Sequence, residues 1–177
     1  YYKDENSFYY HADNDFKKIK RKIDVKSAEK VLELNDFVKD KNNLYYFSNG
    51  KINKTNLNID VNSLVFLDNN SSSYSSYIKD RNNIYFVDNE NGKVKIVKNA
   101  DKNTFQIVNG NYGVDRKNVY YNGEKLDSVG IEGLKIFDDN YLKDNKNVYE
   151  IYATDDEKIR TRAIKNLYID VASFENI

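Results

Sequence analysis

The chain has 177 residues, of which 40% are hydrophobic and 14% aromatic, so it is long enough to bury a core within one domain. Lysine plus arginine and aspartate plus glutamate balance at 28 each, which argues against a nucleic-acid binder with a global basic field. The absence of cysteine excludes disulfides, thiolate nucleophiles and cysteine-based zinc sites, and no apolar run reaches the roughly 18 residues of a membrane span.

A short charged and aromatic motif opens each of five successive segments of the chain. It reads KDKNNLYY over residues 39–46, and a degenerate copy lies at residues 3–10. The other copies occupy residues 79–86, 114–121 and 143–150. A constant motif at uneven spacing indicates fixed turns joined by connections of different length, so an internal repeat organises the sequence.

The motif predicts a tight turn followed by a strand. Its aspartate, Asp40 in the second copy, can accept a hydrogen bond from the backbone two residues on, and its polar middle residues suit a type I turn. The fourth position is asparagine in four of five copies, and asparagine tolerates the left-handed conformation of a bulged turn. The pattern then alternates with period two, with Leu44 and Tyr46 on one side and Tyr45 and Phe47 on the other, which predicts a hairpin strand.

A second turn follows in each unit and leads into a third predicted strand. Asn-Gly pairs at residues 49–50, 91–92 and 122–123 are a strong short-range hairpin signal. In the first and last units the place of that pair is taken by Asp13-Asn14-Asp15 and Thr154-Asp155-Asp156. The strand beyond the turn is clearest at residues 93–96, where we expect lysines outward and aliphatic residues inward.

Each unit closes with a string that begins with aspartate and, in most copies, ends with serine or threonine. The aspartate can cap a single helical turn, and the apolar residue after the string is expected to plug the core. The strings and their plugs are 24–27 with Ala28, 60–63 with Leu64, 101–104 with Phe105, and 170–173 with Phe174. The fourth unit has residues 130–134 in this place, with glycine at positions 130 and 133, and its connection is expected to be a plain loop.

The Asp-Lys-Asn turn followed by Tyr-Tyr, together with the downstream Asp-x-x-Ser/Thr-Phe string, resembles the DKNYY repeat family. The resemblance runs through residues 39–46, 79–86, 114–121 and 143–149, and it weakens in the first copy, where Ser7 replaces asparagine. It implies a repeat scaffold of a bacterial protein, located at the cell envelope. The resemblance brings no catalytic residues.

We expect an all-β fold in which five units of two or three antiparallel strands form a single repeat domain over residues 1–177. A unit of about 35 residues cannot bury a core alone, so the units should stack and cover one another's apolar faces. An elongated, twisted array is favoured over a five-bladed propeller, because propeller blades usually take about 40–45 residues and four strands. The expected units are residues 1–35, 36–73, 74–110, 111–138 and 139–177.

No catalytic or metal-binding constellation stands out in the sequence. The single histidine, His11, fits a hairpin surface better than an acid–base role. The serine-rich stretch at residues 71–76 lacks the glycines of a nucleophile elbow and is expected to be a polar loop. Asp-x-Asn patterns such as the one that begins at Asp40 lack the glutamate that completes a calcium loop. We therefore expect no enzyme activity, no cofactor and no metal.

Two sets of repeated side chains are candidates for binding. Motif tyrosines on an unburied strand face would present a row of rings to a partner, although both rings of each pair could instead pack between units. Basic residues after the second turn could align into a stripe for phosphates or an anionic glycan, although lysines also keep edge strands from aggregating. The candidates are Tyr45, Tyr85, Tyr120 and Tyr149, and Lys17, Lys18, Lys20, Lys93, Lys95, Arg160 and Arg162.

Three functions are compatible with these patterns. The leading hypothesis is a non-enzymatic module that uses a tyrosine-rich repeat surface to engage another protein at the bacterial cell envelope. The second is binding of a polyanion, nucleic acid or glycan along the lysine stripe, and the third is inhibition of another macromolecular machine. The chain starts with Tyr1 rather than methionine, which is compatible with an exported protein whose leader has been removed; an intracellular inhibitor would instead be cytoplasmic.

Overall fold

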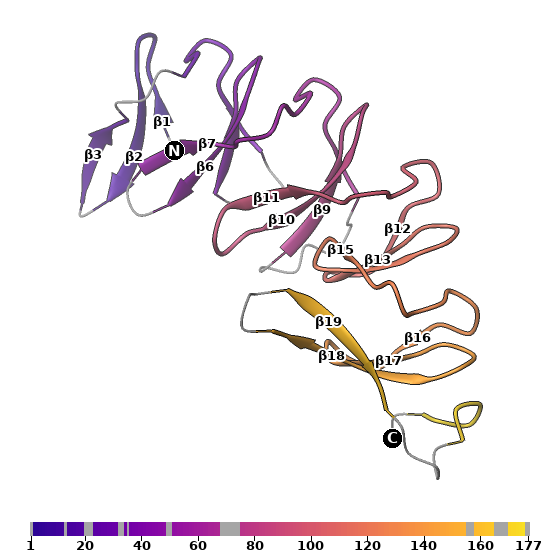
Figure 1. Cartoon of the computed structure of the whole chain (residues 1–177). Coiled ribbons are helices and arrows are strands. Elements are labelled where there is room, and N and C mark those ends of the chain that lie inside the picture. The colour runs from indigo at the N-terminus through magenta and orange to yellow at the C-terminus, as the bar shows by residue number, and fades with distance from the viewer. Residues whose placement is uncertain are drawn as a thin grey trace. The chain divides into compact units, whose positions relative to one another are not determined.

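In the computed structural model, the described residues form 19 strands in five antiparallel sheets and no helix (Figure 1). They are residues 2–12, 14–19, 23–31, 34, 36–48, 51–67, 75–154, 158–164 and 170–175. None of them belongs to a helix that is long and apolar enough to cross a membrane. The chain divides into two compact units, Tyr1–Ile96 and Val97–Ile177. The expected all-β fold of tandem hairpin repeats is confirmed. The choice between an elongated array and a propeller of the five sheets stays a prediction.

The first unit holds three sheets, named A, B and C in chain order (Figure 1). Sheet A consists of β1 (Tyr2–Lys3), β2 (Phe8–Ala12) and β3 (Asp15–Lys18). Sheet B consists of β4 (Glu29–Lys30), β5 (Phe37–Lys39), β6 (Leu44–Ser48) and β7 (Lys51–Lys54). Sheet C consists of β8 (Val65–Phe66), β9 (Ser75–Lys79), β10 (Ile84–Asp88) and β11 (Lys93–Ile96).

The second unit holds sheets D and E. Sheet D consists of β12 (Gln106–Asn109), β13 (Tyr112–Val114), β14 (Val119–Tyr121) and β15 (Glu124–Lys125). Sheet E consists of β16 (Lys135–Ile136), β17 (Tyr141–Lys143), β18 (Val148–Ala153) and β19 (Ile159–Ala163). In all five sheets the strands pair antiparallel with their neighbours in chain order, so every sheet is a simple meander.

Sheets B to E each contain four strands, where two or three were expected. The additional strand is the first of each sheet (β4, β8, β12 and β16), and it follows directly after the closing string of the preceding motif. Three of these strands have only two residues, which is too short to show a period of two in the sequence. The predicted unit boundaries therefore fall inside the sheets: β8 lies in the predicted unit 36–73 but pairs with β9.

The predicted turns are present where the structure describes them. The backbone N–H of Asp40 donates to the carbonyl of Asn43 at 3.0 Å, and the corresponding turn at Asp80 has the same bond. Residues 122–123 form the second turn of sheet D with φ values of 48° and 75°, the left-handed geometry that an Asn-Gly hairpin requires. Residues 49–50 and 155–156 lie outside the described residues.

Sheet B contributes side chains to two separate cores. Tyr45 and Ile52 belong to a buried cluster with Phe8 of sheet A. Phe37, on the opposite side of sheet B, belongs to a second buried cluster with Tyr85 of sheet C. The alternation that predicted a hairpin strand thus belongs to a sheet that has core residues on both faces.

Sheets D and E share a third buried cluster. Leu142 and Ile151 of sheet E pack with Tyr112 and Val119 of sheet D. On β18 the cluster residues are Tyr149 and Ile151, which are spaced by two, and Leu142 pairs with Tyr149. The alternate residues therefore lie on the other side of sheet E, which is described below as the outer face of sheet E.

The serine-rich stretch at residues 71–76 is only partly the polar loop that was expected. Ser75 and Ser76 begin β9, where they pair with Asp88 and Val87 and are buried. The expectation was wrong for these two residues because β10 continues through Asp88 and its hairpin partner β9 extends equally far. Residues 71–74 lie outside the described residues.

Candidate functional site

The motif aspartate joins two turns that are far apart in the sequence. Oδ1 of Asp40 accepts the backbone N–H groups of Asn42 at 2.9 Å and Asn43 at 2.8 Å, as the sequence predicts. Oδ2 accepts the Tyr45 hydroxyl at 2.8 Å and the backbone N–H of Asp24 at 3.2 Å. Burial raises the pKa of Asp40, but the donors, Asn42 first, outweigh it and hold the pKa below its usual value. We call this arrangement a joint.

Three further joints repeat this geometry. The motif aspartates accept a tyrosine hydroxyl in the pairs Asp80–Tyr85 at 2.8 Å, Asp115–Tyr120 at 2.8 Å and Asp144–Tyr149 at 3.0 Å. They also accept a backbone N–H of the preceding closing string, from Asp60 at 2.8 Å, Asp101 at 3.0 Å and Gly130 at 2.9 Å. All three carboxylates are buried, so each joint is a water-excluded, charge-assisted cluster of hydrogen bonds.

The four candidate tyrosines are therefore internal parts of the joints. Tyr45, Tyr85, Tyr120 and Tyr149 are all buried, with their hydroxyls donated to the motif aspartates. Burial and the neighbouring carboxylate raise the pKa of Tyr85 to about 12. The expectation that these rings face a partner was wrong, because all four side chains are buried; Tyr45, for example, packs in a cluster with Phe8 of sheet A. No local pattern separates a covered strand from an open one.

A second bond completes each joint. The serine or threonine of the closing string accepts the backbone N–H of the residue after the motif aspartate, as Ser27 does from Lys41 at 3.0 Å and Ser63 does from Arg81 at 2.9 Å. In the first joint, the side chain of the residue after the motif aspartate also forms an ion pair with the aspartate of the closing string: Lys41 Nζ lies 2.8 Å from Asp24 Oδ2.

The fourth joint keeps this design without the serine. The carbonyl of Glu132 accepts the backbone N–H of Asn145 at 2.9 Å, because Gly133 has no hydroxyl to offer. A Cβ on Gly133 would lie 1.8 Å from Asn145 Oδ1, so the asparagine side chain occupies the vacated space. Residues 130–134 thus form a bonded turn instead of the expected plain loop, since backbone groups replace the missing side chains.

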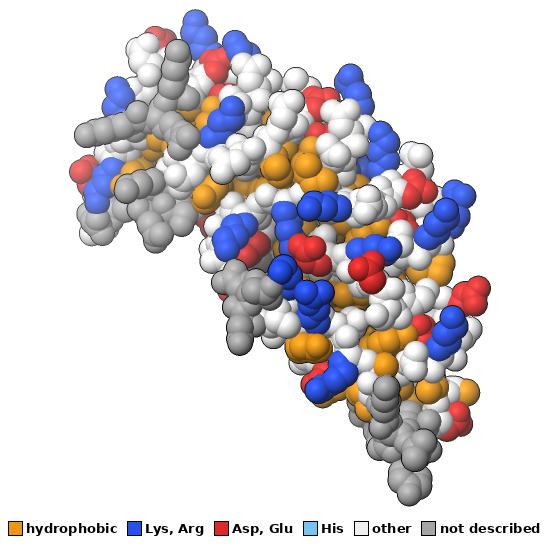
Figure 2. Space-filling view, viewed as in Figure 1, with side chains coloured by type: hydrophobic (Ala, Val, Ile, Leu, Met, Phe, Trp, Pro, Cys, Tyr) orange, Lys and Arg blue, Asp and Glu red, His pale blue; other side chains and the backbone are white. Residues whose placement is uncertain are grey.

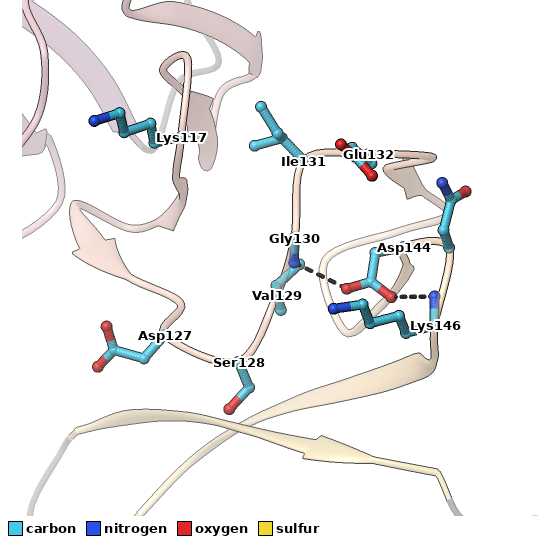
Figure 3. A pocket seen from close by; sticks show the side chains of 10 residues that line it. Lys117, Asp127, Ser128, Val129, Gly130, Ile131, Glu132, Asp144 and Lys146 are labelled. Carbon is cyan, nitrogen blue, oxygen red and sulfur yellow. Dashed lines mark hydrogen bonds between the residues drawn. The ribbon is translucent and has the colours of Figure 1, made fainter.

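The fourth joint borders a hollow of about 470 Å³ (Figure 3). Figure 3 shows the N–H of Gly130 directed at the Asp144 carboxylate, with Lys146 beside it. The lining carries Lys117 and Lys146 together with Asp127, Glu132 and Asp144, so its charges nearly cancel. Among the residues that the structure describes, no group of three His, Cys, Asp or Glu side chains could hold a metal ion.

The basic candidates lie on the outer strands of three different sheets. Lys17 and Lys18 lie on β3, Lys93 and Lys95 on β11, and Arg160 and Arg162 on β19, while Lys20 is outside the described residues. Several contact a side chain of their own sheet: Lys95 Nζ lies 5.6 Å from the ring centroid of Phe86, and Arg162 pairs with Glu150. On the face shown in Figure 2, basic and acidic side chains are interspersed. This placement fits lysines that protect edge strands.

Sheet A presents a cluster of aromatic side chains, three of them exposed and one, Tyr9, half-buried. Tyr2, Tyr9, His11 and Phe16 share one side of the sheet, because Tyr2 pairs with Tyr9 and His11 pairs with Phe16. The Phe16 ring lies 4.8 Å from the Tyr2 ring and 5.2 Å from the His11 ring, both edge-on. We call these four residues the aromatic face. No sequence pattern predicted this face, since Phe16 stands at the start of a basic run.

The outer face of sheet E is the second exposed surface with aromatic residues. It consists of Tyr141, Glu150, Tyr152, Arg160 and Arg162, which cross-strand pairing places on one side. Arg162 lies over the Tyr152 ring at 5.7 Å. Glu150 occupies the motif position that is aromatic in every other copy, so this face is more polar than its counterparts.

The comparison with protein families agrees with the repeat. The model of the DKNYY family matches residues 77–177, which include the motif copies at Asp80, Asp115 and Asp144 and the whole of the last two joints. No curated protein and no solved structure matches the chain. Because the family match spans more than half of the sequence, the chain belongs to the DKNYY family.

Proposed function

We propose that the protein is a non-enzymatic binding module that engages another protein through the aromatic face of sheet A. The observation that carries this proposal is a difference between equivalent positions. Tyr2 and Phe16 are each 54% exposed, whereas the residues at the same register positions of sheet B, Val38 and Ile52, are 1% and 4% exposed. Among the residues that the structure describes, a sheet face that belongs to the core elsewhere in the repeat carries two exposed rings here.

Exposed aromatic rings on a rigid strand pair have the properties of a protein-binding surface. Aromatic residues are enriched at the centre of interfaces, where they dominate the binding energy. Covering the rings of Tyr2 and Phe16 would remove apolar surface from water, which favours association. Their edge-on contact fixes both rings before binding, so little side-chain entropy is lost when a partner docks.

The non-enzymatic part of the proposal is supported by how the repeat uses its reactive groups. The buried carboxylates and tyrosine hydroxyls, such as Asp80 and Tyr85, are hydrogen-bonded to one another and to backbone amides. The ring of His11 lies edge-on to Phe16 on the aromatic face. These groups stabilise the fold, and a structural role accounts for each of them.

A pull-down experiment with matched variants tests the proposal. The tagged chain is compared with Tyr2→Ser/Phe16→Ser and with a control, Val65→Ser/Val108→Ser, whose parent side chains are 48% and 50% exposed on other sheets. We expect partners bound by the parent chain to be retained by the control and lost by the aromatic-face variant. Equal capture by all three proteins would contradict the proposal.

Binding of a polyanion along the basic residues is the competing proposal, and the salt dependence of binding distinguishes the two. Protein binding through an aromatic face should vary little between low and moderate salt, whereas a polyanion should be released steeply as salt rises. We also propose a location at the cell envelope, on the basis of the family resemblance, and fractionation of producing cells tests it. Recovery with the cytoplasm would instead favour an inhibitor of an intracellular machine.

A further inference from the structure

The fourth joint lacks the ion pair that crosses the first two joints. In the first joint Lys41 Nζ lies 2.8 Å from Asp24 Oδ2, and the second joint has an equivalent pair at 3.6 Å. The corresponding positions of the fourth joint hold Asn145 and Gly130, so both charges are missing. Asn145 and Gly130 instead line the hollow of about 470 Å³, whose volume is that of a ligand pocket.

Two of the three carboxylates in the lining are already bonded within the protein. The Asp144 carboxylate accepts four hydrogen bonds, three from backbone N–H groups and one from the Tyr149 hydroxyl. Asp127 Oδ1 lies 3.2 Å from Nζ of Lys125, which is not part of the lining. Neither carboxylate therefore needs a cation from the hollow.

Four other polar groups of the lining remain available to a ligand. Within the part of the chain that the structure describes, no ion pair or side-chain hydrogen bond is formed by the ammonium groups of Lys117 and Lys146, the Glu132 carboxylate or the Ser128 hydroxyl. Figure 3 shows the Lys146 side chain extending toward the backbone at Val129. Two free cations beside one free carboxylate favour a ligand with one negative charge. The carboxylate and the hydroxyl can bond to the neutral polar groups of that ligand.

The apolar part of the lining suits the C–H groups of a sugar ring. Ile131 is 37% exposed, and Figure 3 shows its side chain on the same stretch of backbone as Gly130 and Glu132. No aromatic side chain belongs to the lining that the structure describes, so a nucleobase would lack the ring on which bases usually stack. Groups with two negative charges, such as phosphate, are disfavoured by the carboxylates of Glu132 and Asp127. The lining is thus suited to a ligand with one carboxylate and several hydroxyls.

We infer that the hollow at the fourth joint binds an acidic sugar, of which a uronic acid is the simplest form. Lys117 and Lys146 attract its carboxylate, Glu132 accepts hydrogen bonds from its hydroxyls, and Ile131 covers one face of its ring. This site goes beyond the proposed function, because none of its residues belongs to the aromatic face or to the basic strands. The lining lies entirely between residues 117 and 146, so sheets D and E and their connection provide all of it.

A titration of the whole isotopically labelled chain with sodium glucuronate, followed by NMR, tests the inference. We expect saturable shifts of the amide signals of residues 128–132 and 144–146, with a dissociation constant in the millimolar range. Lys117→Gln/Lys146→Gln should weaken binding by at least about tenfold, because it removes both charge-assisted contacts. The matched control is Lys93→Gln/Lys98→Gln, which removes the same charge at exposed positions outside the lining and should bind as the parent chain does.

Further ligands identify the class of compound that binds. Glucose has the ring without the charge, and acetate has the charge without the ring, so each should bind at least about tenfold more weakly than glucuronate. An unsulfated tetrasaccharide that contains glucuronate distinguishes the two sources of such a sugar. Tighter binding of the tetrasaccharide would assign the sugar to a glycan chain, and equal binding would assign it to the free acid.

Three results would overturn the inference. The first is the absence of saturable shifts up to about 50 mM glucuronate. The second is equal binding of glucuronate and either acetate or glucose, because the hollow would then not recognise an acidic sugar. The third is binding that Lys93→Gln/Lys98→Gln abolishes and Lys117→Gln/Lys146→Gln leaves intact, which would indicate that the anion binds along the basic strands. The pull-down comparison tests a different surface, so it decides the proposed function separately.

Discussion

The backbone nitrogen of Asp60 lies 2.8 Å from Oδ2 of Asp80, so a carboxylate that starts one motif is bonded to the closing string twenty residues earlier. Since the four joints repeat this relationship, each repeat is stabilised mainly by its neighbour in the sequence. Stability should then depend on nearest-neighbour contacts, as in other repeat proteins, and removal of one joint should weaken both repeats that it connects.

Replacing Asp80 by alanine should destabilise the chain strongly. The change leaves the Tyr85 hydroxyl and the amides of Asp60 and Asn83 without their acceptor in a buried place, at a cost of about 3 kcal/mol in the free energy of unfolding. Urea denaturation followed by circular dichroism measures the change. Asp127→Ala, at an exposed carboxylate, is the control and should change that free energy by less than about 0.5 kcal/mol. Similar values for the two variants would contradict the joint.

Removing a single hydroxyl should lower the free energy of unfolding at a buried tyrosine but not at an exposed one. Tyr85→Phe keeps the ring and deletes the bond to Asp80, so we expect a loss of about 1–2 kcal/mol in the free energy of unfolding. Tyr152→Phe keeps the contact of the ring with Arg162 and should leave stability nearly unchanged. The two variants are compared by urea denaturation under identical conditions. A neutral result for Tyr85→Phe would mean that the hydroxyl bond contributes nothing net.

Acid should unfold the chain through its joint aspartates. Burial raises the pKa of Asp115, but hydrogen bonds from Asp101, Lys117 and Tyr120 outweigh it and lower the pKa from 3.8 to about 2. Because the folded value lies below the unfolded one, this carboxylate stabilises the fold above 3.8, and its contribution is lost as pH falls toward about 2. Urea midpoints measured from neutral pH downward should drop across this interval. Asp115→Ala should show a shallower drop, and parallel curves would contradict the assignment.

The turns and hairpins could be predicted because their bonds are local. Asp40 Oδ1 reaches amides only two and three residues away, and the alternation after it needs no knowledge of the rest of the chain. The other oxygen of the same carboxylate bonds to Asp24, sixteen residues away, and no local pattern identifies that partner. The joint was therefore half predicted: its turn was expected, and the connection between repeats was not.

The candidate surfaces were harder to predict for a related reason. Whether a repeated ring is core or surface depends on which sheet covers it. Tyr45 and Tyr9 occupy the same motif position, yet Tyr45 is buried against sheet A while Tyr9 belongs to the aromatic face. The sequence shows that residues 130–134 depart from the pattern of the closing strings. The backbone groups that complete the joint there are identified only by the structure.

Restoring serine to the fourth joint should destabilise it, although serine or threonine stands there in the other closing strings. Gly133 has a φ of +69°, and a Cβ would lie 1.8 Å from Asn145 Oδ1, so Gly133→Ser should cost about 1–3 kcal/mol in the free energy of unfolding. Gly133→Ser/Asn145→Ala should recover part of that loss, because it removes the side-chain clash, while the backbone strain and the 3.2 Å approach of the Cβ to the backbone nitrogen of residue 145 remain. Gly130→Ala is the control: its Cβ would lie 3.3 Å from Asp144 Oδ2, and its effect should be smaller. Urea denaturation of the four proteins decides the matter, and a Gly133→Ser chain as stable as the parent would show that serine fits this joint as it fits the others.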